Sequence, residues 1–306
     1  MLHNNQFIND FMAHYDYPQE AVKAFTELNI RLDNEPDFAA EFDSIVNEYL
    51  FPETDGMREA LDKMTELANK KGINDCTLEF VFLLNCLPTL KERYDKAGIP
   101  EKIFWDTMND LRYKLIECMD CEEVPGTFVA GWFDGFYDMT RFAYGRFQYE
   151  VREFDEDEDF VTACGKVIKK GDTYINFHIP SSGVSLTDDI RIESYKLAYE
   201  AYKDLFPDGK MVFGCSSWLL YPAHKKFLPA KSNILRFMDD FEMVEWEEKE
   251  VFNDGWRIFG KDSDLPFDQL PRDNSLRKAY ADWLSAGNKG GHGFGLFVFD
   301  GEKILK

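Results

Sequence analysis

The sequence predicts an α+β protein, with an all-helical N-terminal domain followed by a mixed, mostly antiparallel twisted sheet with flanking helices. Apolar residues recur at helical spacing through the first 140 residues. A strand-like alternation with period two begins after Gly145. Helical and strand patterns then follow one another to the C-terminus, so we expect two domains, 1–140 and 141–306.

Apolar stripes predict six helices in the N-terminal domain. The stripes occupy residues 18–28, 38–49, 57–71, 78–94, 103–118 and 129–144. Gly72 follows the third stripe and is expected to cap that helix. The fourth stripe is the most uniformly apolar, which predicts the buried helix of the group, and Pro88 is expected to bend or end it.

Strand and helix patterns fill the C-terminal domain. Three strands joined by hairpins are predicted at 146–151, 166–168 and 173–179. The expected order after them is a helix over 195–206, a central strand over 211–215, a helix capped by Ser232, a strand at 256–259, a helix over 276–284 and a last strand at 293–299.

Composition excludes several classes of partner. The 306 residues include 35 Lys and Arg against 57 Asp and Glu, a formal net charge of −22. That balance argues against nucleic acid or an anionic membrane as the main partner. No apolar run reaches about 18 residues and no signal peptide is evident, so we expect a cytoplasmic protein. Cys118 and Cys121 form a lone CxxC with no second pair, so no metal site is expected.

The segment HIPSSGVSLTDD, residues 178–189, lies between a predicted strand and a predicted helix. The backbone N–H groups of Ser181, Ser182 and Gly183 can turn inward at a helix N-terminus, which is an arrangement that binds phosphate. The run from Ser185 to Asp188 also matches a helix capping box, which explains the same residues without a ligand. Asp188 and Asp189 place negative charge on the same turn and weaken the phosphate interpretation.

A second segment, residues 213–237, ends a strand with small polar residues and then crosses two prolines. Its lysines, Lys225, Lys226 and Lys231, are either solvated or join the 181–183 loop around an anion. Cys215 paired with His178 or His224 would make a thiol nucleophile. The simpler interpretation of Cys215 is a small residue that closes a buried strand. A glycine-rich run at 288–295 follows no strand, so we interpret it as a flexible approach to the last strand.

Four stretches of this sequence stand out together: GRFQYE at 145–150, HIPSSG at 178–183, CSSWLL at 215–220 and LPAKSNILRF at 228–237. They resemble the corresponding stretches of a bacterial family of acyltransferase-like proteins, which join a helical N-terminal domain to a domain of the GNAT (N-acetyltransferase) fold. The resemblance spans essentially the whole chain. It implies that two central strands splay apart and hold the pantetheine of an acyl-CoA, acetyl-CoA or another, with no metal.

The same resemblance implies the residues that bind the cofactor. The implied contacts are Phe177, His178 and Ile179 on one strand, Ser181, Ser182, Gly183 and Ser185 in a pyrophosphate loop, Ser217 on the partner strand and Asn233 at the next helix start. Two departures weaken the assignment. The glycine-rich pyrophosphate signature of the wider superfamily is replaced by Pro180 to Gly183, and Tyr221 stands where the family commonly has an acidic residue.

The implied chemistry is direct attack on the thioester carbonyl by an amine. This amine belongs to a small molecule or a peptide. Glu150 or His178 is then a candidate to deprotonate the acceptor, and Tyr221 and Cys215 are candidate acids for the leaving thiolate. Two alternatives stay open. One is a non-catalytic module of the same fold that binds CoA or a partner, and the other is a hydrolase centred on Cys215.

Overall fold

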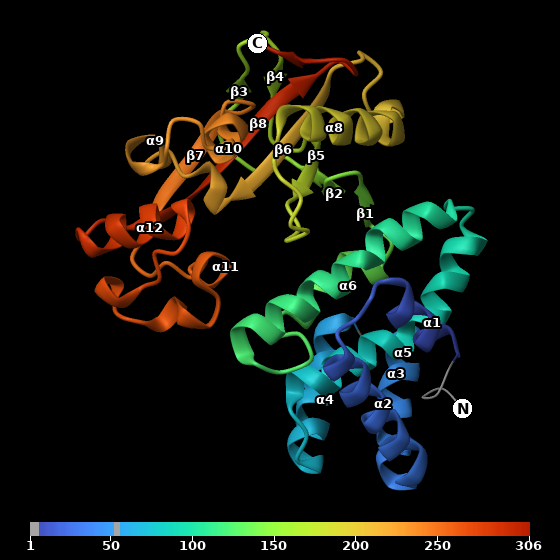
Figure 1. Ribbon diagram of the computed structural model, residues 1–306. Coiled ribbons are helices and arrows are strands. Elements are labelled where there is room, and N and C mark those ends of the chain that lie inside the picture. The colour runs from blue at the N-terminus through green and yellow to red at the C-terminus, as the bar shows by residue number, and fades with distance from the viewer. Residues whose placement is uncertain (1–5, 52–55) are drawn as a thin grey trace. The chain divides into compact units, whose positions relative to one another are not determined.

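The computed structural model describes residues 6–51 and 56–306, which divide at Thr140 and Arg141 into two compact units (Figure 1). The first unit is all helical. Its helices are α1 Gln6–His14, α2 Gln19–Asn34, α3 Pro36–Leu50, α4 Met57–Lys71, α5 Asp75–Lys96, α6 Glu101–Glu122, a 3₁₀ turn at Ala130–Phe133 and α7 Asp134–Tyr137. None of the helices in the described ranges is both long and apolar enough to span a membrane.

Helix α5 is the buried helix that the sequence predicts. Asn74 caps its N-terminus by accepting a hydrogen bond from the Thr77 N–H group, and apolar side chains are buried on all its sides. We expected Pro88 to bend or end this helix. It does not end it, because α5 continues through Pro88 to Lys96. Burial of Leu87 and Leu90 on either side of Pro88 offsets the backbone hydrogen bond that proline cannot donate.

The helix predicted at 129–144 is wrong over its second half. Met139 adopts a left-handed backbone conformation (φ 58°), and the chain then enters strand β1, Arg141–Tyr144. Arg141 and Ala143 are buried and alternate with half-buried neighbours, which is the period of a strand. The C-terminal sheet therefore begins before Gly145 rather than after it.

The second unit is built on one mixed sheet in the order β1-β2-β5-β6-β8-β7, with β9 beside β8. Its strands are β1, β2 Phe147–Glu153, β5 Thr173–His178, β6 Met211–Ser217, β7 Glu242–Lys249, β8 Gly290–Phe299 and β9 Ile304–Leu305. The β5–β6 pair is parallel and every other adjacent pair is antiparallel. The predicted fold class is confirmed.

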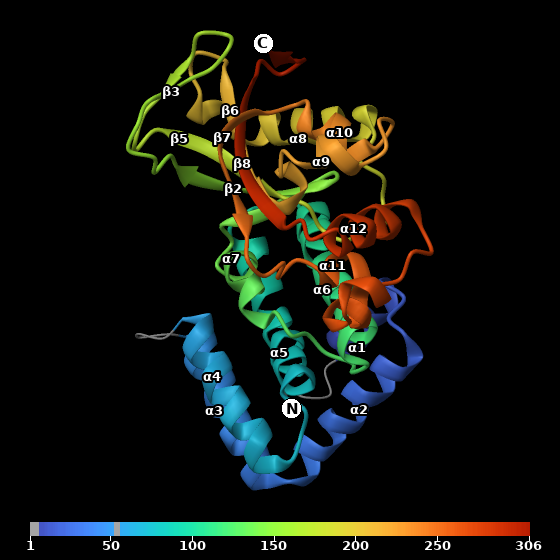
Figure 2. The ribbon, with the colours of Figure 1, turned by 90° about the vertical axis from the view of Figure 1, so that its left-hand side faces the viewer.

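Helices and turns connect these strands. They are α8 Asp188–Tyr202, a 3₁₀ turn at Lys203–Leu205, η3 Trp218–Leu220, α9 His224–Phe227, α10 Asn233–Met238, α11 Trp256–Phe259, 3₁₀ turns at Gly260–Asp264 and Phe267–Gln269 (η5), and α12 Ser275–Ser285. Figures 1 and 2 show α8 and α10 over the same face of the sheet. Tyr195 of α8 packs there against Phe297 of β8, with ring centroids 4.8 Å apart.

One predicted strand pairing and one predicted strand are wrong in this unit. The segment predicted at 166–168 forms β4, Val167–Ile168, which pairs with β3, Phe160–Val161, in a separate two-stranded sheet, so β2 and β5 pair directly. The segment predicted as a strand at 256–259 is helix α11, whose buried residues Ile258 and Phe259 are adjacent. The missing strand is β7, an exposed and acidic edge whose sequence EMVEWEEK lacks an apolar alternation.

The glycines of β8 are packed against neighbouring segments, so the expectation of a flexible approach is wrong. Gly291, Gly293 and Gly295 alternate along β8, and a Cβ at Gly293 would lie 2.6 Å from the carbonyl oxygen of Leu220. A Cβ at Gly291 would lie 2.3 Å from the Tyr221 ring. Glycine is needed here because the chain leaving β6 crosses directly over β8.

Candidate functional site

Strands β5 and β6 are paired over a short length and then separate. Their parallel register joins Ile175 to Phe213 and Asn176 to Gly214. Beyond that point β5 continues to His178 and β6 continues to Ser217, each paired on its outer side with β2 or β8. The separation is the geometry that a ligand with backbone-like amides requires if it is to lie between two strands.

The face of the sheet opposite α8 carries a buried polar network centred on Glu150. Its carboxylate accepts hydrogen bonds from Arg141 at 2.9 and 3.1 Å, from Arg152 at 3.0 Å and from the Asn176 amide at 3.2 Å. Its Oε1 also lies 2.8 Å from Nε2 of His178. Glu150 is directly opposite Arg141 on β1 and Asn176 on β5, so the strand register places these side chains on one face.

Glu150 is ionised at neutral pH, whereas His178 is uncharged. Burial opposes ionisation of Glu150, yet the hydrogen bond from His178 and the charge of Arg141 hold the pKa of its carboxyl well below the usual range. Burial also lowers the pKa of His178, although Glu150 opposes that shift. The pair at neutral pH is therefore a carboxylate and a neutral imidazole. With its hydrogen on Nε2, the imidazole can donate to this carboxylate.

The β5–α8 loop, residues 179–187, follows the separating strand. Arg146 donates to the carbonyl oxygens of Pro180 at 2.8 Å and of Val184 at 3.0 Å. Gly183, between them, has a φ of 73° and open space around its Cβ position. Asn233, the first residue of α10, donates to the Ser185 hydroxyl at 2.7 Å, so the loop and the α10 N-terminus are neighbours.

The other predicted cofactor contacts lie around the same strand ends. Phe177 is fully buried in the core beneath α8, Ile179 is half-buried, and Ser181 is exposed. Ser182 accepts a hydrogen bond from the Val184 N–H group at 3.3 Å, and Ser217 accepts one from the Leu219 N–H group at 3.1 Å. The predicted capping box is wrong, because α8 begins at Asp188 after Thr187 and has no side-chain cap.

The remaining two catalytic candidates lie away from the Glu150 network. Cys215 is 1% exposed within the hydrophobic core, and burial raises the pKa of its thiol. Tyr221 is buried and its hydroxyl donates to Glu248 at 2.9 Å. Burial and that hydrogen bond raise the pKa of Tyr221 to about 12. Glu248 belongs to β7, which lies two strands beyond β6 in the sheet order.

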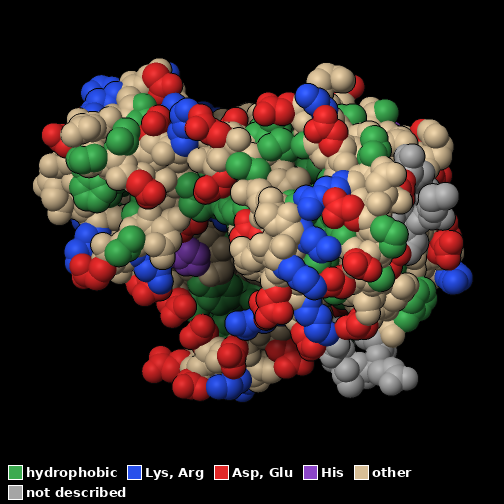
Figure 3. Space-filling model, turned by 90° about the horizontal axis from the view of Figure 1, so that it is seen from below, with side chains coloured by type: hydrophobic (Ala, Val, Ile, Leu, Met, Phe, Trp, Pro, Cys, Tyr) green, Lys and Arg blue, Asp and Glu red, His purple; other side chains and the backbone are tan. Residues whose placement is uncertain are grey.

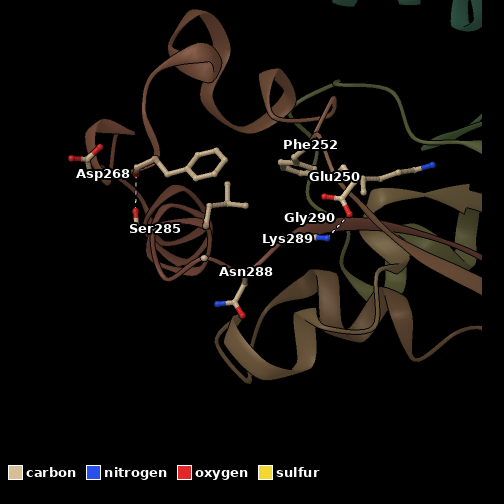
Figure 4. Close-up of a pocket in the computed structure, with 11 residues that line it drawn as sticks. Glu250, Phe252, Asp268, Ser285, Asn288, Lys289 and Gly290 are labelled. Carbon is tan, nitrogen blue, oxygen red and sulfur yellow. Dashed lines mark hydrogen bonds and ion pairs between the residues drawn. The ribbon is translucent and has the colours of Figure 1, made fainter.

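A cavity of about 410 Å³ lies at the end of β7, where α12 and the approach to β8 meet (Figure 4). Its walls include Phe252, Phe267 and Leu284, and Lys289 forms an ion pair with Glu250 at its rim. Phe252 stacks on Tyr280 with ring centroids 5.3 Å apart. The candidate residues at the β5–β6 separation are not part of its lining.

The surface carries more acidic than basic side chains, as the net charge of −22 implies. Figure 3 shows acidic side chains spread across the face viewed there, with Lys and Arg between them. Lys225, Lys226 and Lys231 are exposed, and Lys225 lies 3.9 Å from a carboxylate oxygen of Asp239. In the part of the chain that the structure describes, no group of three or more His, Cys, Asp or Glu side chains is arranged to hold a metal ion.

Sequence reasoning missed four residues of this region: Arg141, Arg146, Arg152 and Asn176. Arg141 fell within a segment predicted as helix, so its strand partner was not visible. Asn176 alternates with His178 in a predicted strand, and that spacing places both on one face. Arg146 acts on a loop that is 34 to 38 residues away in the sequence, a distance at which no local pattern signals a contact.

Comparison with known proteins gives the same two units. Residues 6–139 match a family model described as an N-acyltransferase N-terminal domain, and residues 142–297 match a GNAT-like C-terminal domain. A comparison with curated proteins gave no match. Among solved structures, a crystal structure of an acyltransferase in complex with decanoyl-CoA and teicoplanin superposes with a TM-score of 0.72 at 18% identity, covering 95% of this chain and 87% of that chain.

A second structure, of an acyltransferase in complex with CoA and 10C-teicoplanin, superposes with a TM-score of 0.73 at 18% identity over 97% of this chain and 88% of that one. At these identities the superpositions establish the fold, while the family models match over both units. This chain belongs to the family of GNAT-type acyltransferases that join an N-acyltransferase N-terminal domain to a GNAT-like C-terminal domain.

Proposed function

We propose that this protein is an acyl-CoA-dependent N-acyltransferase that transfers an acyl group, acetyl in the simplest case, from CoA to an amine by direct attack. The observation that carries the proposal is the separation of β5 from β6 with the Glu150–His178 pair on its border. The pantetheine arm contains two amides, and it would lie along the strand edges past Asn176 and Gly214. The solved relatives with decanoyl-CoA and CoA support an acyl-CoA as the donor.

His178 is the proposed general base. An amine must lose a proton as it attacks the thioester, and a neutral imidazole accepts that proton at Nδ1 while Nε2–H remains bonded to Glu150. Glu150 then stabilises the imidazolium, and Arg141 and Asn176 hold the carboxylate in place. The C–N bond forms, the C–S bond breaks, and the CoA thiolate leaves and takes up a proton. The proposal assigns no step to Cys215 or Tyr221.

The predicted cofactor contacts enter the proposal at the loop. Ser181, Ser182, Gly183 and Ser185 would face the diphosphate of CoA, and Asn233 would lie beside it because it bonds Ser185. Phe177 is buried, so its contact to pantetheine would be through its backbone. The proposed acceptor is a primary amine. We expect the reaction to take place in the cytoplasm.

The experiment measures free CoA thiol released from acetyl-, octanoyl- and decanoyl-CoA in the presence of a panel of primary amines. Amine-dependent release supports the proposed enzyme, and the donor used fastest gives the acyl length. Thermal stabilisation by CoA without release by any amine would favour the non-catalytic CoA-binding module of the same fold. A protein that CoA and acyl-CoA leave unstabilised would contradict both.

A further inference from the structure

The two ends of the tip of the β5–α8 loop, residues 181–183, are held by one guanidinium group. Arg146 donates from Nη1 to the carbonyl oxygen of Pro180 and from Nε to the carbonyl oxygen of Val184, at 2.8 and 3.0 Å. These two carbonyls flank Ser181, Ser182 and Gly183. Arginine suits this task because its planar group presents several donors in a fixed geometry, which a lysine ammonium does not.

The position of Arg146 is set by the β1–β2 hairpin. Tyr144 pairs with Phe147, so Gly145 and Arg146 form a two-residue turn, and Gly145 has the positive φ (67°) that such a turn requires. Ser194 of α8 donates to the Tyr144 carbonyl at 2.5 Å and accepts from the Phe147 N–H group at 3.2 Å. The turn is therefore docked on the same helix that follows the loop.

An anion binds a loop through its backbone N–H groups, so the carbonyl dipoles of that loop must point elsewhere. Arg146 donates hydrogen bonds to two of these carbonyl oxygens. Arg191 donates to a third, the Leu186 oxygen, at 2.7 Å. Arg191 also pairs with Asp188 at 3.1 Å. Asp188, one of the two acidic residues that opposed phosphate binding in the sequence, thus has a cationic partner, which it shares with Asp240.

We propose that Arg146 is a positioning residue for the cofactor: it orders residues 180–184 so that the loop receives the diphosphate of CoA. Its positive charge adds to the effect in a chain with a net charge of −22. This inference rests on the proposed function, since it concerns the same loop. It predicts a role in donor binding and none in the chemical step.

The test compares Arg146→Gln, Arg146→Lys and wild type with two donors, acetyl-CoA and S-acetylpantetheine, which lacks the diphosphate. The control is Lys196→Gln, which also removes one positive charge but from an exposed ion pair on α8 with Glu302. The readouts are KM and kcat for each donor and the thermal shift caused by CoA. Circular dichroism and the melting temperature without ligand verify that each variant is folded.

We expect Arg146→Gln to raise KM for acetyl-CoA by about tenfold, roughly the loss of one charge-assisted contact, with kcat and the pantetheine KM unchanged. Arg146→Lys should recover only part of this, and Lys196→Gln should match wild type. Equal losses on both donors, full recovery with lysine, or a CoA thermal shift equal to that of wild type would overturn the inference. A wild-type protein that CoA does not stabilise would instead reject the proposed function and the inference with it.

Discussion

Oε1 of Glu150 lies 2.8 Å from Nε2 of His178, and the two residues differ in exposure: the carboxylate side chain is 6% exposed and the imidazole 24%. The buried partner, Glu150, is held by Arg141 from β1, Asn176 from β5 and Arg152 from its own strand, β2. The half-buried partner, His178, lies at the end of β5, where that strand has separated from β6. A buried carboxylate thus orients a partly exposed imidazole.

Replacing His178 by Ala should lower kcat by about a hundredfold or more, the usual contribution of a general base, with little change in KM for acyl-CoA. The physical reason is that the attacking amine loses its proton acceptor. Initial rates of thiol release measure the effect. His14→Ala, an exposed histidine of the helical unit, is the control. A His178→Ala variant with wild-type kcat would remove the proposed base.

The pH profile of kcat should fall on the acid side as His178 becomes protonated. Because the pKa of His178 is lowered, the midpoint lies below the ordinary value of about 6.5. Glu150 raises that pKa through its hydrogen bond and charge, so Glu150→Gln should move the midpoint to a lower pH as well as reduce kcat. A midpoint that moves upward in Glu150→Gln would contradict this account of the pair.

Replacing Arg141 by Ala should lower the free energy of unfolding by about 3 kcal/mol at pH 7, because Glu150 would remain buried with its main cation removed. The folded pKa of Glu150 is depressed, so its stabilising contribution is full above the unfolded pKa near 4.5 and is lost as the pH falls. The difference in the free energy of unfolding between Arg141→Ala and wild type should therefore become smaller as the pH is lowered from 7 to 3. Urea titrations measure it. Lys278→Ala, in an exposed pair, should cost less than about 1 kcal/mol.

Cys215→Ala should keep kcat within about a factor of two while costing about 1 kcal/mol of stability, since it removes a small buried side chain. In the native wild-type protein this thiol should react slowly with iodoacetamide, because burial raises its pKa. Mass spectrometry of alkylated peptides follows the reaction. Loss of turnover in a folded Cys215→Ala protein would instead support the alternative of a hydrolase that depends on the Cys215 thiol.

Tyr221→Phe separates a structural role from a catalytic one. Loss of the hydrogen bond to Glu248 should cost about 1 kcal/mol of stability, and we expect kcat to change by less than about threefold. A tenfold loss of kcat with unchanged KM would instead indicate that Tyr221 protonates the leaving thiolate. Both quantities are measured on one preparation by thermal unfolding and thiol release.

The sequence predicted the parts of the fold that local patterns encode. The 57–71 stripe gives α4 with Gly72 as its C-cap, and the uncharged run at 211–215 gives the central strand β6. Strand β7 escaped prediction because its exposed edge is acidic rather than alternating. The 129–144 stripe failed because pairing with β2, which is tertiary, decides the structure of Arg141 to Tyr144.

The candidate site, too, could be predicted from the sequence only in part. Alternation along β5 is a signal that could have grouped Asn176 with His178, although the sequence analysis did not select Asn176. The register with β2 then adds Glu150. The direction of the Tyr221 side chain depends on how the segment after β6 crosses β8. The sequence indicates this crossing only through the alternating glycines of β8. The loop contacts of Arg146 depend on the docking of a hairpin on α8, and no spacing rule reports that.

The most direct test of the central claim is a crystal structure of the protein with CoA. We expect pantetheine between β5 and β6 beyond Asn176 and Gly214, the diphosphate at residues 181–185, and the thiol within reach of His178 Nδ1. CoA bound elsewhere, for example with its thiol in the cavity between Phe252 and Phe267, would contradict the account.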